Sequence, residues 1–149
     1  MNRALLFSLA ALPLFVACKK DDPKTKTELL TDKNWQLKAA TSDPGLPVNG
    51  TTVTDYYGQL PACAKDDIER FEKPNVYKFD EGSNRCANSP QTTVGSWVFS
   101  SDESKITITD ASGSQTADIL ELSENTMKLK FQIPGGNVTY NITATYSKL

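Results

Sequence analysis

Histidine is absent from the 149-residue chain, which excludes several kinds of catalytic and metal site. A Ser-His-Asp triad, a Cys-His dyad and a histidine-ligated zinc site all need an imidazole group. A basic excess is also lacking, because 16 Lys and Arg residues stand against 18 Asp and Glu residues, for a net charge of −2. Nucleic acid needs a positive field around its phosphates, so it is not an expected partner. The length predicts one domain, and a hydrophobic content of 38% suffices for one modest core.

The N-terminus lacks a hydrophobic run long enough to cross a membrane. Residues 1–3 carry a basic charge, and residues 4–17 are apolar apart from Ser8 and Pro13. At about 1.5 Å per helical residue this run spans only about 21 Å, against about 30 Å of bilayer hydrocarbon. We interpret residues 1–17 as a signal peptide. The alternative, a buried N-terminal helix, is disfavoured by the abrupt change to polar residues at Lys19.

The end of this segment resembles a lipoprotein processing site. Phe15-Val16-Ala17-Cys18 is similar to the lipobox of bacterial lipoproteins. This resemblance implies that the Cys18 thiol accepts lipid and that cleavage occurs before it. Several acyl chains, palmitate among them, would give durable membrane anchoring where a single chain is marginal.

The four residues directly after Cys18 are all charged. Lys19-Lys20-Asp21-Asp22 resembles the export signal of Bacteroidetes lipoproteins, which directs them to the outer leaflet of the outer membrane. The alternative is an ordinary charged tether. Residues 18–27 are therefore expected to form a lipidated cysteine and a flexible linker. The predicted localisation is the outer membrane, with the domain facing the cell surface.

The other two cysteines, Cys63 and Cys86, are expected to form a disulfide in an oxidising compartment. The closed loop of 23 residues would contribute roughly 3 kcal/mol in the chain-entropy model. The alternatives are a redox pair or a nucleophilic pair. They are disfavoured because the chain has no histidine to activate a thiolate and no CxxC spacing.

Residues 28–149 are predicted to form one all-β domain with a short helix at its start, at residues 27–32 with Thr27 as N-cap. Residues 35–39 alternate as a first strand, and residues 40–66 are predicted to be a long irregular stretch. Residues 55–60 form a helical turn within it. The remaining strands are expected at residues 68–71, 76–79, 92–99, 105–109, 115–122, 127–133 and 138–146.

About eight sequential strands predict an eight-stranded antiparallel up-and-down barrel. Open edges on such a meander invite aggregation, and closure removes them. A two-sheet sandwich is the alternative. An eight-stranded barrel is either filled by its own side chains or just wide enough for one small ligand.

Several short motifs follow one another in a specific order and spacing within residues 28–149. They are Leu30 with Trp35-x-Leu37, Cys63-Ala64-Lys65-Asp66-Asp67-Ile68 with Phe71, Phe79-Asp80-Glu81-Gly82, Cys86, Pro90-Gln91 and Gly95-Ser96-Trp97. With these motifs the mature chain resembles the lipocalin-like domain of Bacteroidetes lipoproteins. The resemblance implies an up-and-down barrel whose Trp35 closes the floor, and it implies a small apolar ligand only weakly.

An acidic cluster at Asp66, Asp67, Glu69 and Glu72 has two interpretations. It is either a calcium site or a solvated strand entrance, and the second is favoured because no DxDxDG loop is present. A pair of carboxylates flanking a cleft can hydrolyse a glycoside. With 18 acidic residues such pairs arise by chance, so no enzymatic role, no metal and no cofactor is expected.

Tyr56, Tyr57 and Leu60, on the long irregular stretch, are the candidate ligand- or partner-binding residues. Tyrosine offers a large apolar face and a polar tip, which suits recognition. The alternative is that they plug the mouth of the barrel, held down by Cys63. The other aromatic residues are assigned to the core, or for the last two to the core or a cavity lining: Trp35, Trp97, Tyr140 and Tyr146.

Two functions from different classes remain open. The leading hypothesis is a noncatalytic module that binds a small apolar or amphiphilic molecule inside the barrel. The alternative is a barrel packed solid, whose loops bind a surface protein or a host factor. A pocket of several hundred Å³ would favour the first hypothesis, and bulky side chains meeting at the centre would favour the second.

Overall fold

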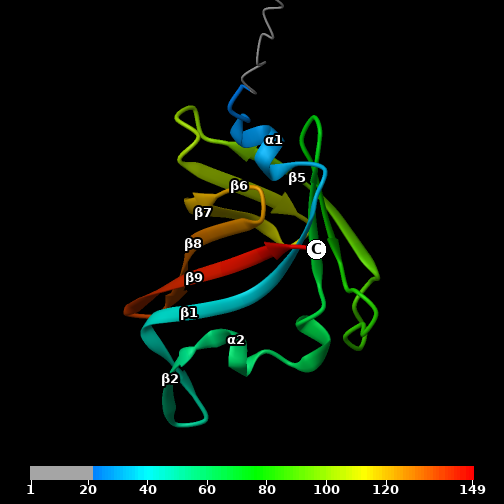
Figure 1. The fold of residues 1–149 in the computed structure, drawn as a ribbon. Helices are drawn as coiled ribbons and strands as arrows, with labels where there is room; N and C mark the ends of the chain where they lie inside the picture. Colours follow the sequence, from blue (N-terminus) through cyan, green and yellow to red (C-terminus); the bar gives the residue numbers. More distant parts are fainter. Residues whose placement is uncertain (1–21) are drawn as a thin grey trace, which may run out of the picture.

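A single antiparallel sheet rolls up until its first strand meets its last (Figure 1). The computed structural model describes residues 22–149, so the predicted signal peptide and Cys18 lie outside the described residues. Eight strands close the barrel, as expected from the sequence. They are β1 (Asn34–Val48), β3 (Ile68–Glu72), β4 (Val76–Asp80), β5 (Thr92–Phe99), β6 (Lys105–Asp110), β7 (Gly113–Leu122), β8 (Thr126–Gly135) and β9 (Val138–Lys148).

The seam of the barrel is the long pairing between β1 and β9. It runs from Trp35 opposite Lys148 to Asp43 opposite Asn141. On its other side β1 pairs with β3, where Asn34 lies opposite Arg70. Each barrel strand therefore has two neighbours, and the alternative of a two-sheet sandwich is wrong.

The predicted irregular stretch at residues 40–66 is partly wrong. Strand β1 continues to Val48 and turns into a ninth strand, β2 (Thr51–Asp55), which pairs only with β1. The prolines in β1 are tolerated because an edge hairpin leaves some backbone N–H groups without a required partner. The expected helical turn is present as α2 (Tyr56–Gln59), followed by the 3-10 turn η1 (Ala62–Ala64).

The N-terminal helix α1 (Lys26–Leu30) begins slightly earlier than predicted, because its N-cap is Thr25 and not Thr27. The Thr25 hydroxyl accepts a hydrogen bond from the Glu28 backbone N–H at 3.2 Å, and the Thr25 N–H donates to the Glu28 carboxylate at 2.8 Å. This capping box satisfies two N–H groups that would otherwise lack partners. Among the described residues, no helix is long and apolar enough to cross a membrane.

Large apolar side chains fill the end of the barrel that α1 covers. Trp35 is 0% exposed, and its indole N–H donates to the Leu30 carbonyl at 2.9 Å, as expected for a residue that closes the floor. Phe71 packs at this end against Tyr77 and Trp97, with ring centroids 5.4 and 6.1 Å away.

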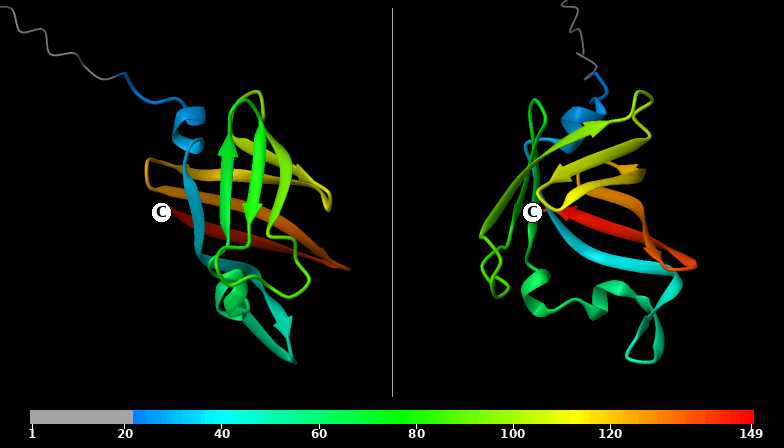
Figure 2. Two further views of the ribbon diagram at one scale, coloured as in Figure 1. Left: turned by 90° about the vertical axis from the view of Figure 1, so that its right-hand side faces the viewer. Right: turned by 180° about the vertical axis from the view of Figure 1, so that it is seen from behind.

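The two helices lie at opposite ends of the barrel (Figure 2). The turn between β5 and β6 lies at the α1 end, since the Lys26 ammonium bonds to the Glu103 carbonyl. Because the strands run up and down in sequence, the β6–β7 and β8–β9 turns lie at the other end. We call the end that α1 covers the closed end, and the opposite end the α2 end.

Replacing Trp35 with alanine should lower the free energy of unfolding by about 3–5 kcal/mol, because it opens a cavity in the closed end and leaves the Leu30 carbonyl unpaired. Urea denaturation measures this loss. The matched control is Val98→Ala on β5, where the side chain is 53% exposed and the change should stay within about 0.5 kcal/mol. Equal losses in the two variants would contradict the assignment of Trp35 to the core.

Candidate functional site

The inner face of β3 carries the central group of the site. Side chains alternate along a strand, so Asp67 and Glu69 share the inward face with Phe71, which is 0% exposed. The Arg70 side chain belongs to the other face, where its Nε donates to the Asn34 side chain at 2.8 Å. Glu69 therefore lies inside the barrel, two residues further from the closed end than Phe71.

A cavity of about 340 Å³ lies inside the barrel beside Glu69. Its polar lining groups include the side chains of Glu69, Tyr77 and Tyr146, and its border reaches the exposed β6–β7 turn at Ser112. That turn places the mouth of the cavity at the α2 end. The apolar part of the lining comes from three strands and consists of Ile108, Ala117, Leu129 and Phe131.

A second cavity of about 210 Å³ lies between the barrel wall and the segment that contains α2. Glu69 and Tyr146 border this cavity as well as the larger one. The other lining residues are apolar or aromatic except for one carboxylate, and they are Leu37, Tyr56, Leu60, Ala64, Asp67 and Phe79.

Burial raises the pKa of Glu69 to about 7, because the interior of the barrel disfavours the charged form. Hydrogen bonding to the hydroxyls of Tyr146 and Tyr77 acts in the opposite direction, and the nearby charge of Asp67 adds to the rise. Glu69 keeps some accessible surface because it borders the cavities. Burial also raises the pKa of both tyrosines, so their hydroxyls stay protonated.

Asp67 is the second carboxylate of the interior. Burial, followed by the charges of Glu81, Asp66 and Asp80, raises its pKa to about 6. Its Oδ1 atom is buried and has no hydrogen-bond partner among residues 22–149. Such an atom is costly to bury, and a bound group that donates a hydrogen bond would lower this cost.

The three residues predicted to contact a ligand do not share one position. Tyr56 and Leu60 line the second cavity, together with residues of the barrel interior. Tyr57 instead lies beneath the Lys65 ammonium, which is 5.1 Å from its ring centroid. The α2 turn that holds them is capped by Asp55, whose carboxylate accepts from the Gly58 N–H at 2.9 Å. Their role in binding stays a prediction.

The acidic residues at positions 66–72 do not form one cluster, and the interpretation as a solvated strand entrance is wrong for Glu69. Asp66 instead holds the loop after β4, since its Oδ2 accepts from the backbone N–H groups of Ser83 and Asn84 at 2.8 and 2.9 Å. Glu72 forms an ion pair with Lys78 at 2.8 Å on the outer face. In the part of the chain that the structure describes, no group of three or more Asp, Glu, Cys or His residues is placed to hold a metal ion.

Cys63 in η1 and Cys86 form a disulfide with an S–S distance of 2.01 Å. The bond joins the segment after α2 to the loop between β4 and β5. The same loop is held by buried Glu81, whose carboxylate accepts from the Cys86 backbone N–H at 2.9 Å. The segment after α2, which supplies Ala64 to the lining of the second cavity, is thereby fixed to the loop between β4 and β5.

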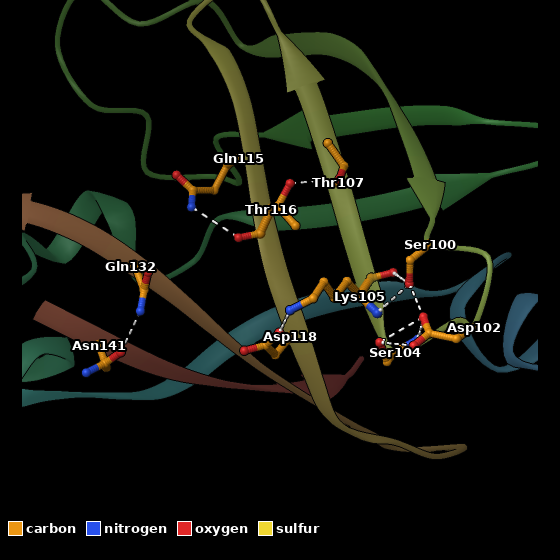
Figure 3. A network of polar contacts seen from close by, with 10 residues as sticks. All are labelled: Ser100, Asp102, Ser104, Lys105, Thr107, Gln115, Thr116, Asp118, Gln132 and Asn141. Carbon is orange, nitrogen blue, oxygen red and sulfur yellow. Dashed lines mark hydrogen bonds and ion pairs between the residues drawn. The ribbon is translucent and has the colours of Figure 1, made fainter. Parts of the chain in front are cut away.

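The outer face of β6 and β7 is polar, in contrast to the interior (Figure 3). Thr107 and Thr116 share a hydrogen bond of 2.8 Å across the two strands, and Lys105 forms an ion pair with Asp118. Residues of opposite parity on the same strands, such as Ile108 and Ala117, line the larger cavity. The alternation seen in the sequence therefore corresponds to a polar, solvent-facing side and an apolar, inward-facing side of these strands.

Sequence reasoning did not identify Glu69, Tyr77 and Asp110 as members of one site. Glu69 was assigned to an acidic cluster, Tyr77 to an ordinary strand and Asp110 to a turn, yet all three border the larger cavity. The strand pattern alone did not identify Glu69, because Glu69 shares the face of Phe71 while Ile68 gives the other face of β3 a large apolar residue as well.

Comparison with known proteins gives one family match. The model of the lipocalin-like domain family matches residues 31–129, from the entrance of β1 into β8. Among solved structures, a complex of bovine odorant binding protein with a selenium-containing odorant is similar, with 11% sequence identity and a TM-score of 0.44. The match covers 88% of this chain and 77% of that chain. Comparison with curated proteins gives no match.

The interior carboxylates should make the fold less stable as pH rises. In the folded protein the pKa of Glu69 is about 7, whereas the ordinary pKa of a glutamate is 4.5. Between these pH values the folded state therefore binds more protons than the unfolded state. The free energy of unfolding should therefore fall across this interval, by up to about 3 kcal/mol. Urea denaturation at pH 5 and pH 8 measures the change.

Glu69→Gln should be more stable than the wild type at pH 8 and should show a flatter dependence on pH. A smaller slope should remain, because the pKa of Asp67 is also raised, to about 6. The matched control is Glu121→Gln, the same chemical change at an exposed position of β7. Identical slopes in the two variants would show that Glu69 is not the buried titrating group.

Proposed function

The chain belongs to the lipocalin-like domain family, and from this premise we propose that it is a noncatalytic barrel that binds one small apolar or amphiphilic molecule. The observation that carries the proposal is the interior cavity of about 340 Å³. Ligand pockets of proteins have volumes of roughly 300–1,000 Å³, mostly apolar walls and a few polar groups. The wall of β6, β7 and β8 residues around Glu69 fits this description.

The division of the interior favours a ligand over the alternative of a solid barrel that acts through its loops. Side chains of Leu30, Ile106 and Met127 are each about 1% exposed and fill the closed end. The α2 end is not filled in this way, since both cavities lie toward it. A barrel that served only as a support for loops would gain stability by filling this space.

Noncatalytic binding agrees with the chemistry of the interior. The chain has no histidine, and Cys63 and Cys86 are joined in a disulfide. The polar groups in the larger cavity include two phenols with raised pKa values and a carboxyl group that is half protonated near neutral pH. These groups can orient a ligand by hydrogen bonds.

We further propose that Cys18 is lipidated and that the barrel is held at the outer membrane, facing the cell surface. The residues that support this are the lipobox-like Phe15-Val16-Ala17-Cys18 and the charged Lys19-Lys20-Asp21-Asp22 that follows. A disulfide in the domain agrees with export, because such bonds persist outside the reducing cytoplasm. A surface protein is then the second class of partner in this proposal.

Binding should be detectable with N-phenyl-1-naphthylamine, an uncharged apolar dye whose fluorescence rises in a dry pocket. Residues 22–149 contain every core residue and hydrogen bond described above and are the segment to use, folded under oxidising conditions. Ile108→Phe places a larger side chain in the larger cavity and reduces its free volume, so it should weaken dye binding at least about tenfold. Val94→Phe, at a position 61% exposed on the outer face of β5, is the matched control. Absence of dye binding to the wild type, or equal loss in both variants, would overturn the assignment.

Lipidation should depend on Cys18. In cells that make the full chain, an alkyne-tagged palmitate should label the wild type, and Cys18→Ser should abolish the label. Cys63→Ser is the matched control, because that thiol is assigned to the disulfide and its loss should leave labelling intact. Protease added to whole cells should degrade the labelled protein if the barrel faces outward. Labelling of the Cys18→Ser chain would contradict the anchor, and protection from protease would contradict the outward orientation.

A further inference from the structure

We propose that the molecule bound in the barrel carries a cationic nitrogen beside its apolar body, and that Glu69 pairs with this cation. The inference rests on the proposed function and specifies the class of ligand. It starts from the signs of the charges around the two cavities. Their lining residues include the carboxylates of Glu69, Asp67 and Asp110, and none of the described lining residues is a lysine or an arginine.

Glu69 is the carboxylate best placed for this role, because it borders both cavities. Asp110 lies at the mouth, where its Oδ1 already accepts from the Ser112 N–H at 2.7 Å. Asp67 has one buried oxygen without a hydrogen-bond partner among residues 22–149, and its negative charge adds to that of Glu69. The nearby Lys65 ammonium lies over the Tyr57 ring and does not line either cavity.

The surroundings of Glu69 also suit a cation with an apolar body. The rings of Tyr77 and Tyr146 border the larger cavity, and aromatic faces attract ammonium groups. Beyond them the wall is formed by Ile108, Leu129 and Phe131, which offer an apolar surface without hydrogen-bonding groups. A ligand placed here would have its charged end at Glu69 and its apolar part along β6 and β8.

The energetics distinguish three head groups. Folding has already removed Glu69 from bulk water, so the only desolvation cost of pairing is that of the cation. The attraction between the cation and the Glu69 carboxylate offsets this cost. An alcohol of the same length gains one hydrogen bond and no charge pairing. A carboxylate would meet three acidic side chains and no cation among the described lining residues, and it should be rejected.

Pairing with a cation should also displace a proton. Without a bound ligand the pKa of Glu69 is about 7, so near this pH the Glu69 carboxyl group is protonated in about half of the molecules. The groups that face Glu69 are Tyr77 on β4, Tyr146 on β9 and Asp67 just before β3, with Asp110 at the mouth. A cation at Glu69 favours its charged form, so binding at pH 7 should release part of a proton and should tighten toward pH 8.

The test compares octylamine, octanol and octanoate, which share one chain and differ in head group, as competitors of N-phenyl-1-naphthylamine at pH 8. Octylamine should compete at least about tenfold more strongly than octanol, and octanoate should compete least. In Glu69→Gln the ratio of octylamine to octanol affinity should fall to within about threefold. Glu121→Gln, an exposed change of the same chemistry, should keep the wild-type ratio.

Calorimetry at pH 7 in buffers of different ionisation enthalpy supplies the second readout. Octylamine binding should release protons from the wild type and from Glu121→Gln, and markedly fewer from Glu69→Gln. If the dye binds but octylamine has no advantage over octanol, or octanoate competes best, the inference about the ligand class fails while the proposed function stands. If the dye and all three competitors fail to bind to a folded protein, the proposed function itself fails.

Discussion

The seam between β1 and β9 is the constraint on which the rest of the structure depends. It joins residues at the two ends of the described chain, and its outermost part is marked by the Asn141 side chain donating to the Asp43 carbonyl at 3.0 Å. Closing so long a loop costs chain entropy, and the many paired backbone groups along the seam offset that cost. Without it the inner faces of eight strands would be exposed to water, and neither a packed core nor an interior cavity would exist.

The closed barrel divides its interior into two environments. At the closed end, helix α1 supplies Leu30, and aromatic side chains centred on Phe71 fill the space. At the α2 end, smaller residues such as Ala117 leave room, and the chain accepts a carboxyl group at Glu69. Stability is concentrated in the first environment, so the second can hold polar groups that would be costly in a densely packed core.

Much of this architecture could be predicted from the sequence, because alternation and turn residues are local. Strand β5 has the predicted bounds, and β8 and β9 extend the predicted alternation by a few residues. The second half of β1 could not be predicted in this way. Residues after Ala39 lose regular alternation and include prolines. Residues 40–43 form a strand because β9 pairs with them from about 100 residues away, and residues 46–48 because they form a hairpin with β2.

The site was harder to predict than the fold. Both faces of β3 carry one large apolar residue, Ile68 on one and Phe71 on the other, so the pattern alone does not decide which face is inward. Only the packing of Phe71 against Tyr77 and Trp97 decides it, and this places Glu69 inside. Positions of α2 residues relative to the cavity likewise depend on the disulfide and on the path of the loop, which local patterns do not encode.

The position of α1 determines which way the barrel points. The described chain passes from Asp22 into α1 at the closed end, and the β6–β7 turn lies at the opposite end (Figure 2). That turn borders the larger cavity at Ser112. Anything that holds the N-terminus to a surface therefore attaches the barrel at its filled end and leaves the mouth on the side away from the attachment. A molecule that enters the cavity would then arrive from the medium and not from the surface to which the protein is attached.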